Sequence, residues 1–212
     1  MKINILVTGG SGFIGSAIVK YLVRNKHNVI VLDNNSRGRS RRIEEVRNEI
    51  KFIKGDIRNK TKLLSIHNKI DTVIHLAYVN GTKHFYKKPY EILDIAVNGL
   101  LNILEFCRHK KVKNFFLASS SEVYQNPLKF PTNEMEMLKI PDIHNPRYSY
   151  GGGKIFSELY GLHFAKKYLK KFIIFRPHNV YGKDMGNEHV IPEFINRFKK
   201  IGKRKSFLIH GT

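Results

Sequence analysis

The stretch Ile3-Asn-Ile-Leu-Val-Thr-Gly-Gly-Ser-Gly-Phe-Ile-Gly15 decides the fold of this chain. The apolar run at its start predicts a buried parallel strand, and a helical pattern follows the glycines directly. Gly9 permits a tight turn, Gly12 lets a pyrophosphate approach the backbone, and Gly15 lets the helix pack on the strand. The order strand, glycine turn, helix predicts a dinucleotide-binding motif, although a glycine-rich turn without a ligand can have the same spacing.

A second apolar run, Asn28 to Leu32, ends at Asp33, eighteen residues after Gly15. In a dinucleotide-binding fold this is the place for a carboxylate that accepts hydrogen bonds from a ribose 2′-hydroxyl. A 2′-phosphate would meet a like charge there, so Asp33 favours NAD over NADP. Arginines that could accommodate a 2′-phosphate follow, but a solvated basic loop is the favoured interpretation of Arg37, Arg39, Arg41 and Arg42.

Apolar runs and helical patterns alternate along the chain, which predicts an α/β fold with a doubly wound, Rossmann-like parallel sheet and helices on both faces. The predicted strands are Ile3–Thr8, Asn28–Leu32, Lys51–Lys54, Thr72–Leu76, Asn114–Ser119, Phe172–Phe175 and Phe207–Ile209. The predicted helices are Phe13–Arg24, Thr61–His67, Pro89–His109, Tyr150–Leu169 and Val190–Lys200. Four prolines mark Gln125–Arg147 as a loop.

The composition narrows the choice of partners. Lysine and arginine number 38 against 17 acidic residues, for a formal net charge of +21, but they are spread along the chain in short pairs such as Lys110-Lys111. We therefore expect no nucleic-acid partner. The chain holds no run of eighteen apolar residues, so we expect no membrane partner. The single cysteine, Cys107, cannot form an internal disulfide, a cytoplasmic location fits this usage, and no metal site is expected.

The residues that could carry chemistry fall at the predicted carboxyl ends of strands and on one later helix. Tyr150 and Lys154 are one helical turn apart, so their side chains point the same way. A tyrosine hydroxyl has a pKa of about 10, and a nearby ammonium favours the phenolate. Tyr150 could then take a proton from a sugar hydroxyl while hydride leaves the carbon for NAD, with Ser120 hydrogen-bonded to the same oxygen. A surface Tyr–Lys pair is common, but chance explains it poorly after this glycine turn, aspartate and serine run.

Other strand ends allow two interpretations each. Asp56 and Ile57 could present a carboxylate and a side chain to an adenine, or could simply form a turn. His75 is more often a satisfied core histidine than a functional group. Ala77, two residues later, is small enough for a cofactor to lie close to the backbone.

Taken together, the motifs resemble the NAD-dependent epimerase/dehydratase family, the extended short-chain dehydrogenase/reductases that remodel nucleotide sugars. The matching segments are Thr8-Gly-Gly-Ser-Gly-Phe-Ile-Gly15, Asp33, Gly55-Asp56-Ile57, His75-Leu-Ala77, Asn98, Ser119-Ser-Ser-Glu-Val-Tyr124, Tyr150-Gly-Gly-Gly-Lys154 and Arg176-Pro-His-Asn-Val-Tyr-Gly182. The resemblance implies that Ser120, Tyr150 and Lys154 form a catalytic triad, and that Ser121 and Asn179 contact the substrate. The residues expected to hold NAD are Gly9, Gly12, Phe13, Ile14, Gly15, Asp33, Asp56, Ile57, Leu76, Ala77, Asn98, Tyr150, Lys154, Pro177 and Val180.

The resemblance also bears on the reaction. The family's 4,6-dehydratases carry an Asp-Glu pair just after the catalytic hydroxyl residue, where this chain has Ser121 and Glu122. The missing acid argues against dehydration, and the Ser-Glu pair resembles UDP-glucuronate decarboxylases, with Glu122 as a catalytic residue. We therefore expect oxidation of a UDP-linked sugar to a transient 4-keto intermediate, followed by epimerisation or decarboxylation.

Members of the family continue beyond the point where this sequence stops, into a small substrate-binding domain. We accordingly expect an NAD-binding domain over residues 1–182 and the start of a substrate-binding region over 183–212. The alternative is a truncated, non-catalytic NAD-binding module. By analogy with the family, a homodimer could form through the predicted helices Pro89–His109 and Tyr150–Leu169.

Overall fold

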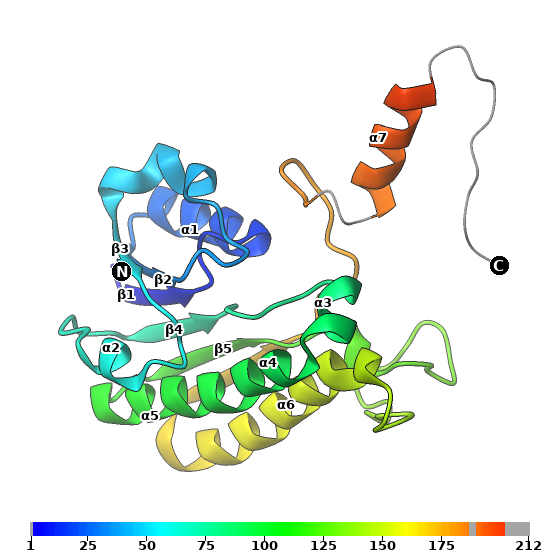
Figure 1. The fold of residues 1–212 in the computed structure, drawn as a ribbon. Coiled ribbons are helices and arrows are strands. Elements are labelled where there is room, and N and C mark those ends of the chain that lie inside the picture. The colour runs from blue at the N-terminus through cyan, green and yellow to red at the C-terminus, as the bar shows by residue number, and fades with distance from the viewer. Residues whose placement is uncertain (1, 187–189, 202–212) are drawn as a thin grey trace. The chain divides into compact units, whose positions relative to one another are not determined.

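The computed structural model of the protein describes residues 2–186 and 190–201. Its centre is a six-stranded parallel sheet in the order β3-β2-β1-β4-β5-β6 (Figure 1), which confirms the predicted doubly wound architecture. The strands are β1 (Asn4–Thr8), β2 (Asn28–Asp33), β3 (Ile50–Lys54), β4 (Thr72–His75), β5 (Asn114–Ala118) and β6 (Lys171–Phe175), each within one or two residues of its predicted bounds. The strand predicted at Phe207–Ile209 lies outside the described residues.

The register of the central strands creates one place for a ligand. Thr8 at the end of β1 is paired with Leu32 of β2 on one side and with His75 of β4 on the other. The carboxyl ends of β1, β2 and β4 therefore lie at the same edge of the sheet. From β1 the chain winds toward β3, whereas from β4 it winds toward β6. The connections therefore leave the sheet in opposite directions between β1 and β4, which is where open α/β sheets bind ligands.

The helices agree with the sequence pattern where the apolar period is strong. The α-helices are α1 (Phe13–Arg24), α2 (Lys60–Leu64), α3 (Thr82–Lys87), α4 (Pro89–Asp94), α5 (Leu100–Lys110), α6 (Ser149–Tyr168) and α7 (Val190–Ile201). The 3₁₀ segments are η1 (Ser40–Glu49), η3 (Ser121–Val123) and η4 (Pro146–Tyr148), and η2 (Ile95–Gly99) is a π-helix. The single helix predicted at Pro89–His109 is thus three consecutive segments, because η2 inserts a wider turn. Helix α3 and η1 were not predicted.

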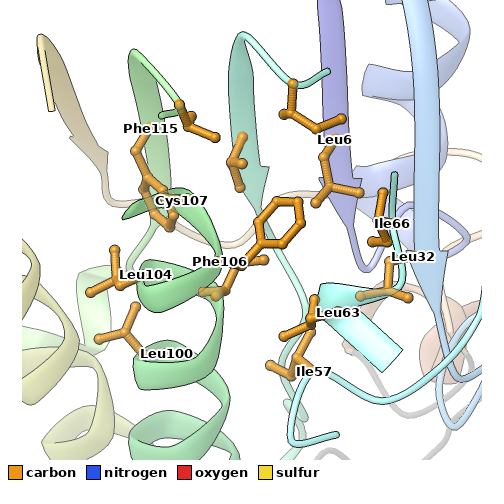
Figure 2. Close-up of a cluster of buried hydrophobic side chains, with 14 of the residues drawn as sticks. Leu6, Leu32, Ile57, Leu63, Ile66, Leu100, Leu104, Phe106, Cys107 and Phe115 are labelled. Carbon is orange, nitrogen blue, oxygen red and sulfur yellow. The ribbon is translucent and has the colours of Figure 1, made fainter. Parts of the chain in front are cut away.

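The sheet separates two apolar layers, as the alternation of side chains along a strand requires. Ile5 and Val7 of β1 face a cluster with α1 and η1, whereas Leu6 faces a cluster with α2 and α5. Figure 2 shows the second cluster, in which Phe106 of α5 lies among side chains from the sheet and from the segment around α2. Helices therefore cover both faces and leave the carboxyl ends of the strands for polar residues.

Internal contacts divide the chain between His178 and Asn179, and each unit is described by itself. The second unit contains α7, close to the helix predicted at Val190–Lys200. The domain boundary expected after residue 182 stays a prediction. Within the described part of the chain, no helix combines the length and the apolar character needed to cross a bilayer.

Candidate functional site

In the turn after β1, two of the glycines occupy positions where a side chain would be strained or would clash. Gly9 has a φ of +73°, a conformation that side-chain-bearing residues rarely adopt, and a Cβ there would lie 2.7 Å from the amide nitrogen of Ala77. A Cβ at Gly15 would lie 2.1 Å from the carbonyl oxygen of Gly9, so α1 can approach the turn only because this position lacks a side chain. The roles predicted for the first and third glycines therefore have a steric basis in the structure.

Asp33 ties the end of β2 to this turn. One of its carboxylate oxygens accepts a hydrogen bond from the amide of Ser11 at 3.0 Å, and the other accepts one from the amide of Asn35 at 2.8 Å. A Cβ at Gly38 would lie 3.0 Å from both oxygens, so the following loop also passes close to this carboxylate. Asp33 is buried and lies in the wall of a pocket, the position expected for a ribose contact.

That pocket lies at the carboxyl ends of the central strands. Seven of the predicted cofactor residues line it: Gly9, Gly12, Asp33, Asp56, Ile57, Leu76 and Ala77. Sequence reasoning missed other lining residues, among them Leu32, Asn34, Ser36, Arg37, Gly38, Gly55, Tyr78, Val79 and Ile95. Four of these nine are directly adjacent to predicted residues, so for them the signal that could have found them is adjacency to a strand end: Leu32, Asn34, Gly55 and Tyr78.

The basic loop after β2 is solvated only in part. Arg39 and Arg41 are exposed, as predicted, but Arg42 is buried, which corrects the interpretation for that residue. Arg37 lies in the pocket wall, with its guanidinium 2.8 Å from Nε2 of His84 on α3.

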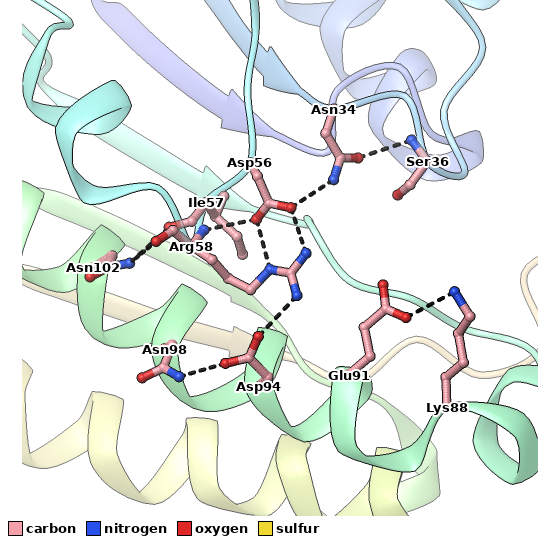
Figure 3. Close-up of polar contacts among 10 residues, drawn as sticks. All are labelled: Asn34, Ser36, Asp56, Ile57, Arg58, Lys88, Glu91, Asp94, Asn98 and Asn102. Atoms are coloured by element: carbon pink, nitrogen blue, oxygen red, sulfur yellow. Dashed lines mark hydrogen bonds and ion pairs between the residues drawn. The ribbon is translucent and has the colours of Figure 1, made fainter.

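A polar network holds the Asp56 side of the pocket (Figure 3). Arg58 donates its backbone amide and two guanidinium nitrogens to Asp56 at 2.8–3.0 Å, and a further nitrogen to Asp94 of α4 at 2.9 Å. The Arg58 hydrogen bond lowers the pKa of Asp56, and the amide of Asn34 adds a bond of 3.0 Å. Asp56 thus forms a turn with Arg58 and lines the pocket, and its predicted contact with an adenine stays a prediction.

The three side chains of the predicted catalytic triad come together beside the pocket. Tyr150 and Lys154 are buried on α6, and Ser120 is buried just after β5. The Lys154 ammonium donates a hydrogen bond to the carbonyl oxygen of Ala118 at 2.7 Å, and its nitrogen lies 5.6 Å from the centre of the Tyr150 ring. Tyr150 and Lys154 are not part of the pocket lining itself; Tyr78, which does line it, contacts both.

Burial sets the protonation of these groups. It raises the pKa of Tyr150 to about 12, while a hydrogen bond with Ser120 lowers it and the charge of Glu122 raises it further. It also lowers the pKa of Lys154 to about 7, against the charge of Glu158 on the same helix. The prediction that a nearby ammonium and the positive ring of an oxidised nicotinamide together favour a Tyr150 phenolate stays a prediction, since burial by itself acts in the opposite direction.

The Ser-Glu pair after Ser120 has partners of its own. The Ser121 hydroxyl lies 2.7 Å from Nδ1 of His178, and the Ser121 amide donates to the carbonyl oxygen of Pro177 at 3.1 Å. Both oxygens of Glu122 accept hydrogen bonds from Arg147, at 3.1 and 3.0 Å. His178 and Arg147 were not predicted as site residues, although His178 lies within the predicted motif Arg176–Gly182 and Arg147 lies three residues before Tyr150.

The comparison with known families decides which group this chain represents. The family model described as "NAD dependent epimerase/dehydratase family" matches residues 5–212. The chain belongs to this family. Its members are defined by NAD dependence, which confirms the predicted cofactor class and the predicted resemblance.

Relatives within the epimerase/dehydratase family differ in the reaction that their names give. The chain is 33% identical to a dTDP-D-glucose 4,6-dehydratase from Dictyostelium discoideum, over 99% of this chain and 50% of the relative. It is 35% identical to a UDP-N-acetyl-alpha-D-glucosaminuronate decarboxylase from Bacillus cytotoxicus, over 92% of this chain and 61% of the relative. Its fold is similar to a UDP-glucose 4-epimerase from Thermotoga maritima solved with UDP-glucose, with a TM-score of 0.83, 31% identity, and coverage of 93% of this chain and 63% of that one. The chain thus spans half to about two thirds of the length of such relatives.

The pocket of this family member fits the cofactor class. It combines a glycine turn that presents backbone instead of side chains, the buried Asp33 carboxylate, and a second carboxylate from Asp56. His75 belongs to the core rather than to the site: it is buried, and its Nδ1 lies 2.8 Å from the Thr8 hydroxyl. The core interpretation of His75 therefore fits the structure.

Other predicted residues are not among those that line the pocket. Asn98 is exposed on η2 and donates to Asp94 at 2.5 Å, so the structure does not bring it to the site; its neighbour Ala96 is buried against α6 instead. Asn98 belongs to the π-helical segment η2, which the sequence pattern does not predict. Phe13, Ile14 and Gly15 begin α1 beyond the lining residues. Asn179 and Val180 fall in the second unit, and their predicted contacts stay predictions.

Proposed function

We propose that the protein oxidises C4 of a UDP-linked sugar to a transient ketone and completes an epimerisation or a decarboxylation. The observation that carries the proposal is the meeting of Ser120, Tyr150 and Lys154 beside a pocket suited to a dinucleotide. NAD, when bound, supplies the hydride acceptor. The turn at Gly9 and Gly12 would hold its pyrophosphate, Asp33 a ribose, and Asp56 with Ile57 the adenine.

Tyr150 would act as the base. Its hydroxyl must lose a proton to accept the one from the sugar 4-hydroxyl, and burial alone opposes this by raising its pKa to about 12. The hydrogen bond with Ser120 acts in the required direction. A positive charge near the Tyr150 ring, from the Lys154 ammonium or from an oxidised nicotinamide, would act in the same direction. Ser120 would also hydrogen-bond the sugar oxygen and keep it within reach of Tyr150.

The residues after Ser120 favour decarboxylation or epimerisation over loss of water. Elimination of water needs a proton donor near the leaving hydroxyl. Here Ser121 is hydrogen-bonded to His178, and both oxygens of Glu122 accept hydrogen bonds from Arg147. A carboxylate in this arrangement is an acceptor rather than a donor. The ketone at C4 is itself enough to activate C5 or to labilise a carboxylate at C6.

The test is to mix the NAD-loaded protein with UDP-hexoses and UDP-uronates and to follow the absorbance of reduced nicotinamide. We expect a transient signal with at least one sugar. Mass spectrometry of the product separates the outcomes: epimerisation keeps the mass, decarboxylation removes carbon dioxide, and dehydration removes water. A protein that binds NAD but gives neither signal nor product with any sugar would instead fit the non-catalytic module.

A further inference from the structure

Tyr78 follows β4, and its hydroxyl is buried although it forms no hydrogen bond with the described residues. Burial raises the pKa of Tyr78, and the proximity of Tyr150 raises it further. An unpartnered buried hydroxyl costs stability, so the contacts of the ring have to account for its position.

The ring of Tyr78 lies against both active groups of α6. The Lys154 nitrogen is 3.8 Å from the centre of the Tyr78 ring, well inside the range of a cation–π interaction. The ring of Tyr150 meets it edge to face, with centres 5.2 Å apart and planes at 89°. The ammonium is thus held by one aromatic face and by the carbonyl oxygen of Ala118.

Gly153 supplies the space for this ring. A Cβ at this position would lie 2.2 Å from the Tyr78 hydroxyl oxygen, but 3.6 Å from the ring carbon that carries it. It would also lie 2.8 Å from the Cβ of Ala96. The absence of a side chain at Gly153 therefore makes room for the Tyr78 hydroxyl and for Ala96, which gives a packing reason for one of the four glycines inside α6.

We propose that Tyr78 is a positioning residue whose ring face holds the charged Lys154 beside Tyr150, with Gly153 as its packing partner. The inference rests on the proposed function, in which Tyr150 and Lys154 act on the sugar hydroxyl. Tyr78 itself makes no contact with the reacting atoms in this account. It acts by keeping the ammonium charged and in place.

The charge of Lys154 depends on a few identified neighbours. Glu158, one turn further along α6, raises its pKa, whereas burial lowers it to about 7. His75 on β4 also faces Lys154, and burial followed by the Lys154 charge lowers the pKa of His75 to about 3, so His75 is neutral at pH 7. Two further titratable groups beside Lys154 are Tyr150 and Tyr78. Because Lys154 titrates near neutrality, loss of a cation–π contact would change how much of it is charged.

The experiment is an NMR titration of the protein with ¹³C in the lysine ε-positions, without NAD or sugar. The Lys154 signal is assigned as the one that is absent from Lys154→Met. In Tyr78→Leu we expect the Lys154 midpoint to fall by about one pH unit, and in Tyr78→Phe, which keeps the ring face, we expect it to stay close to wild type. An unchanged midpoint in Tyr78→Leu would overturn the proposal.

A second measurement covers the case in which Tyr78→Leu does not fold. Gly153→Ala should lower the melting temperature in the wild-type background and should lower it less in the Tyr78→Phe background, where the opposing hydroxyl is gone. Equal losses in both backgrounds would also overturn the proposal. Neither readout needs turnover, so failure here is distinct from the absence of a reduced-nicotinamide signal, which would contradict the proposed function.

Discussion

The two parts of the candidate site are built in different ways. The part at the ends of β1, β2 and β3 consists of backbone and of short polar contacts, such as those from Asp33 to the amides of Ser11 and Asn35. The part on α6 consists of buried aromatic rings around the buried Lys154. In the first part, hydrogen bonds within the protein hold polar groups in position for a ligand. In the second part, burial shifts the pKa values of Tyr150 and Lys154. Binding and chemistry should therefore respond separately to substitution.

The largest difference between the effect on turnover and the effect on NAD binding is expected for Tyr150→Phe. Removal of the hydroxyl leaves the ring stacked on Phe85, so the fold and the NAD pocket should persist. Turnover of any UDP-sugar substrate should fall by at least about a hundredfold, because the proton acceptor is lost. Calorimetry with NAD should give a dissociation constant within about twofold of wild type. A parallel loss of NAD binding would contradict the division into two parts.

Asp33→Ala should affect NAD binding directly, in contrast to Tyr150→Phe. It removes the proposed ribose contact and two hydrogen-bond acceptors that hold the turn, so we expect NAD to bind about ten- to a hundredfold more weakly. Asp71→Ala is the matched control, because Asp71 accepts hydrogen bonds from Asn4 at 2.9 and 3.2 Å near the start of β1. This control should lower the melting temperature and leave the NAD affinity unchanged. Similar affinities for the two variants would show that Asp33 has only a structural role.

The buried lysine should be visible in the dependence of stability on pH. Its native pKa of about 7 lies below the ordinary 10.5, so between these values the unfolded chain holds a proton that the native chain has released. Stability therefore rises with pH in this window, and below pH 7 the native state bears the full cost of burying the charge. Lys154→Met should be more stable than wild type by about 5 °C below pH 7, with the advantage shrinking toward alkaline pH. A difference in melting temperature that does not vary with pH would contradict the burial of a titrating lysine.

The smallest effect is expected for Arg58→Leu. Arg58 is partly exposed and acts through Asp56, so its loss should weaken NAD binding by about threefold and lower stability by about 1 kcal/mol. Calorimetry and urea unfolding measure the two effects. Asp94→Asn is a useful companion, since it weakens only the far end of the network shown in Figure 3. A larger effect on NAD binding from Asp94→Asn than from Arg58→Leu would show that the network acts in another way.

The sequence predicts the first part of the site better than the second for a physical reason. Gly9, Asp33 and Asp56 act through local backbone geometry at strand ends, so their spacing along the chain is the signal. Tyr78 and Gly153 are far apart in the sequence, and only the packing of α6 reveals that the hydroxyl of one fills the space at the other. Asn98 illustrates the same limit, because it lies in the π-helical segment η2, which the apolar period of a regular helix does not predict.

The elements of the fold likewise differ in how well local sequence patterns predict them. The strands and α1 have strong apolar periods, and their bounds are predicted within one or two residues. The segment η1 offers only Ile43 and Val46 as buried apolar residues among polar neighbours, so its pattern is too weak to be recognised. Local patterning thus defines the sheet, and tertiary packing defines the short helices that surround the site.

The most direct test of the account is a crystal structure of the protein with saturating NAD. We predict that the pyrophosphate lies against the turn at Gly9 and Gly12, that the adenosine ribose hydroxyls bond Asp33, and that the nicotinamide ring faces the Tyr150 hydroxyl. Density for NAD elsewhere, an empty pocket at saturation, or a nicotinamide directed away from Tyr150 would contradict it.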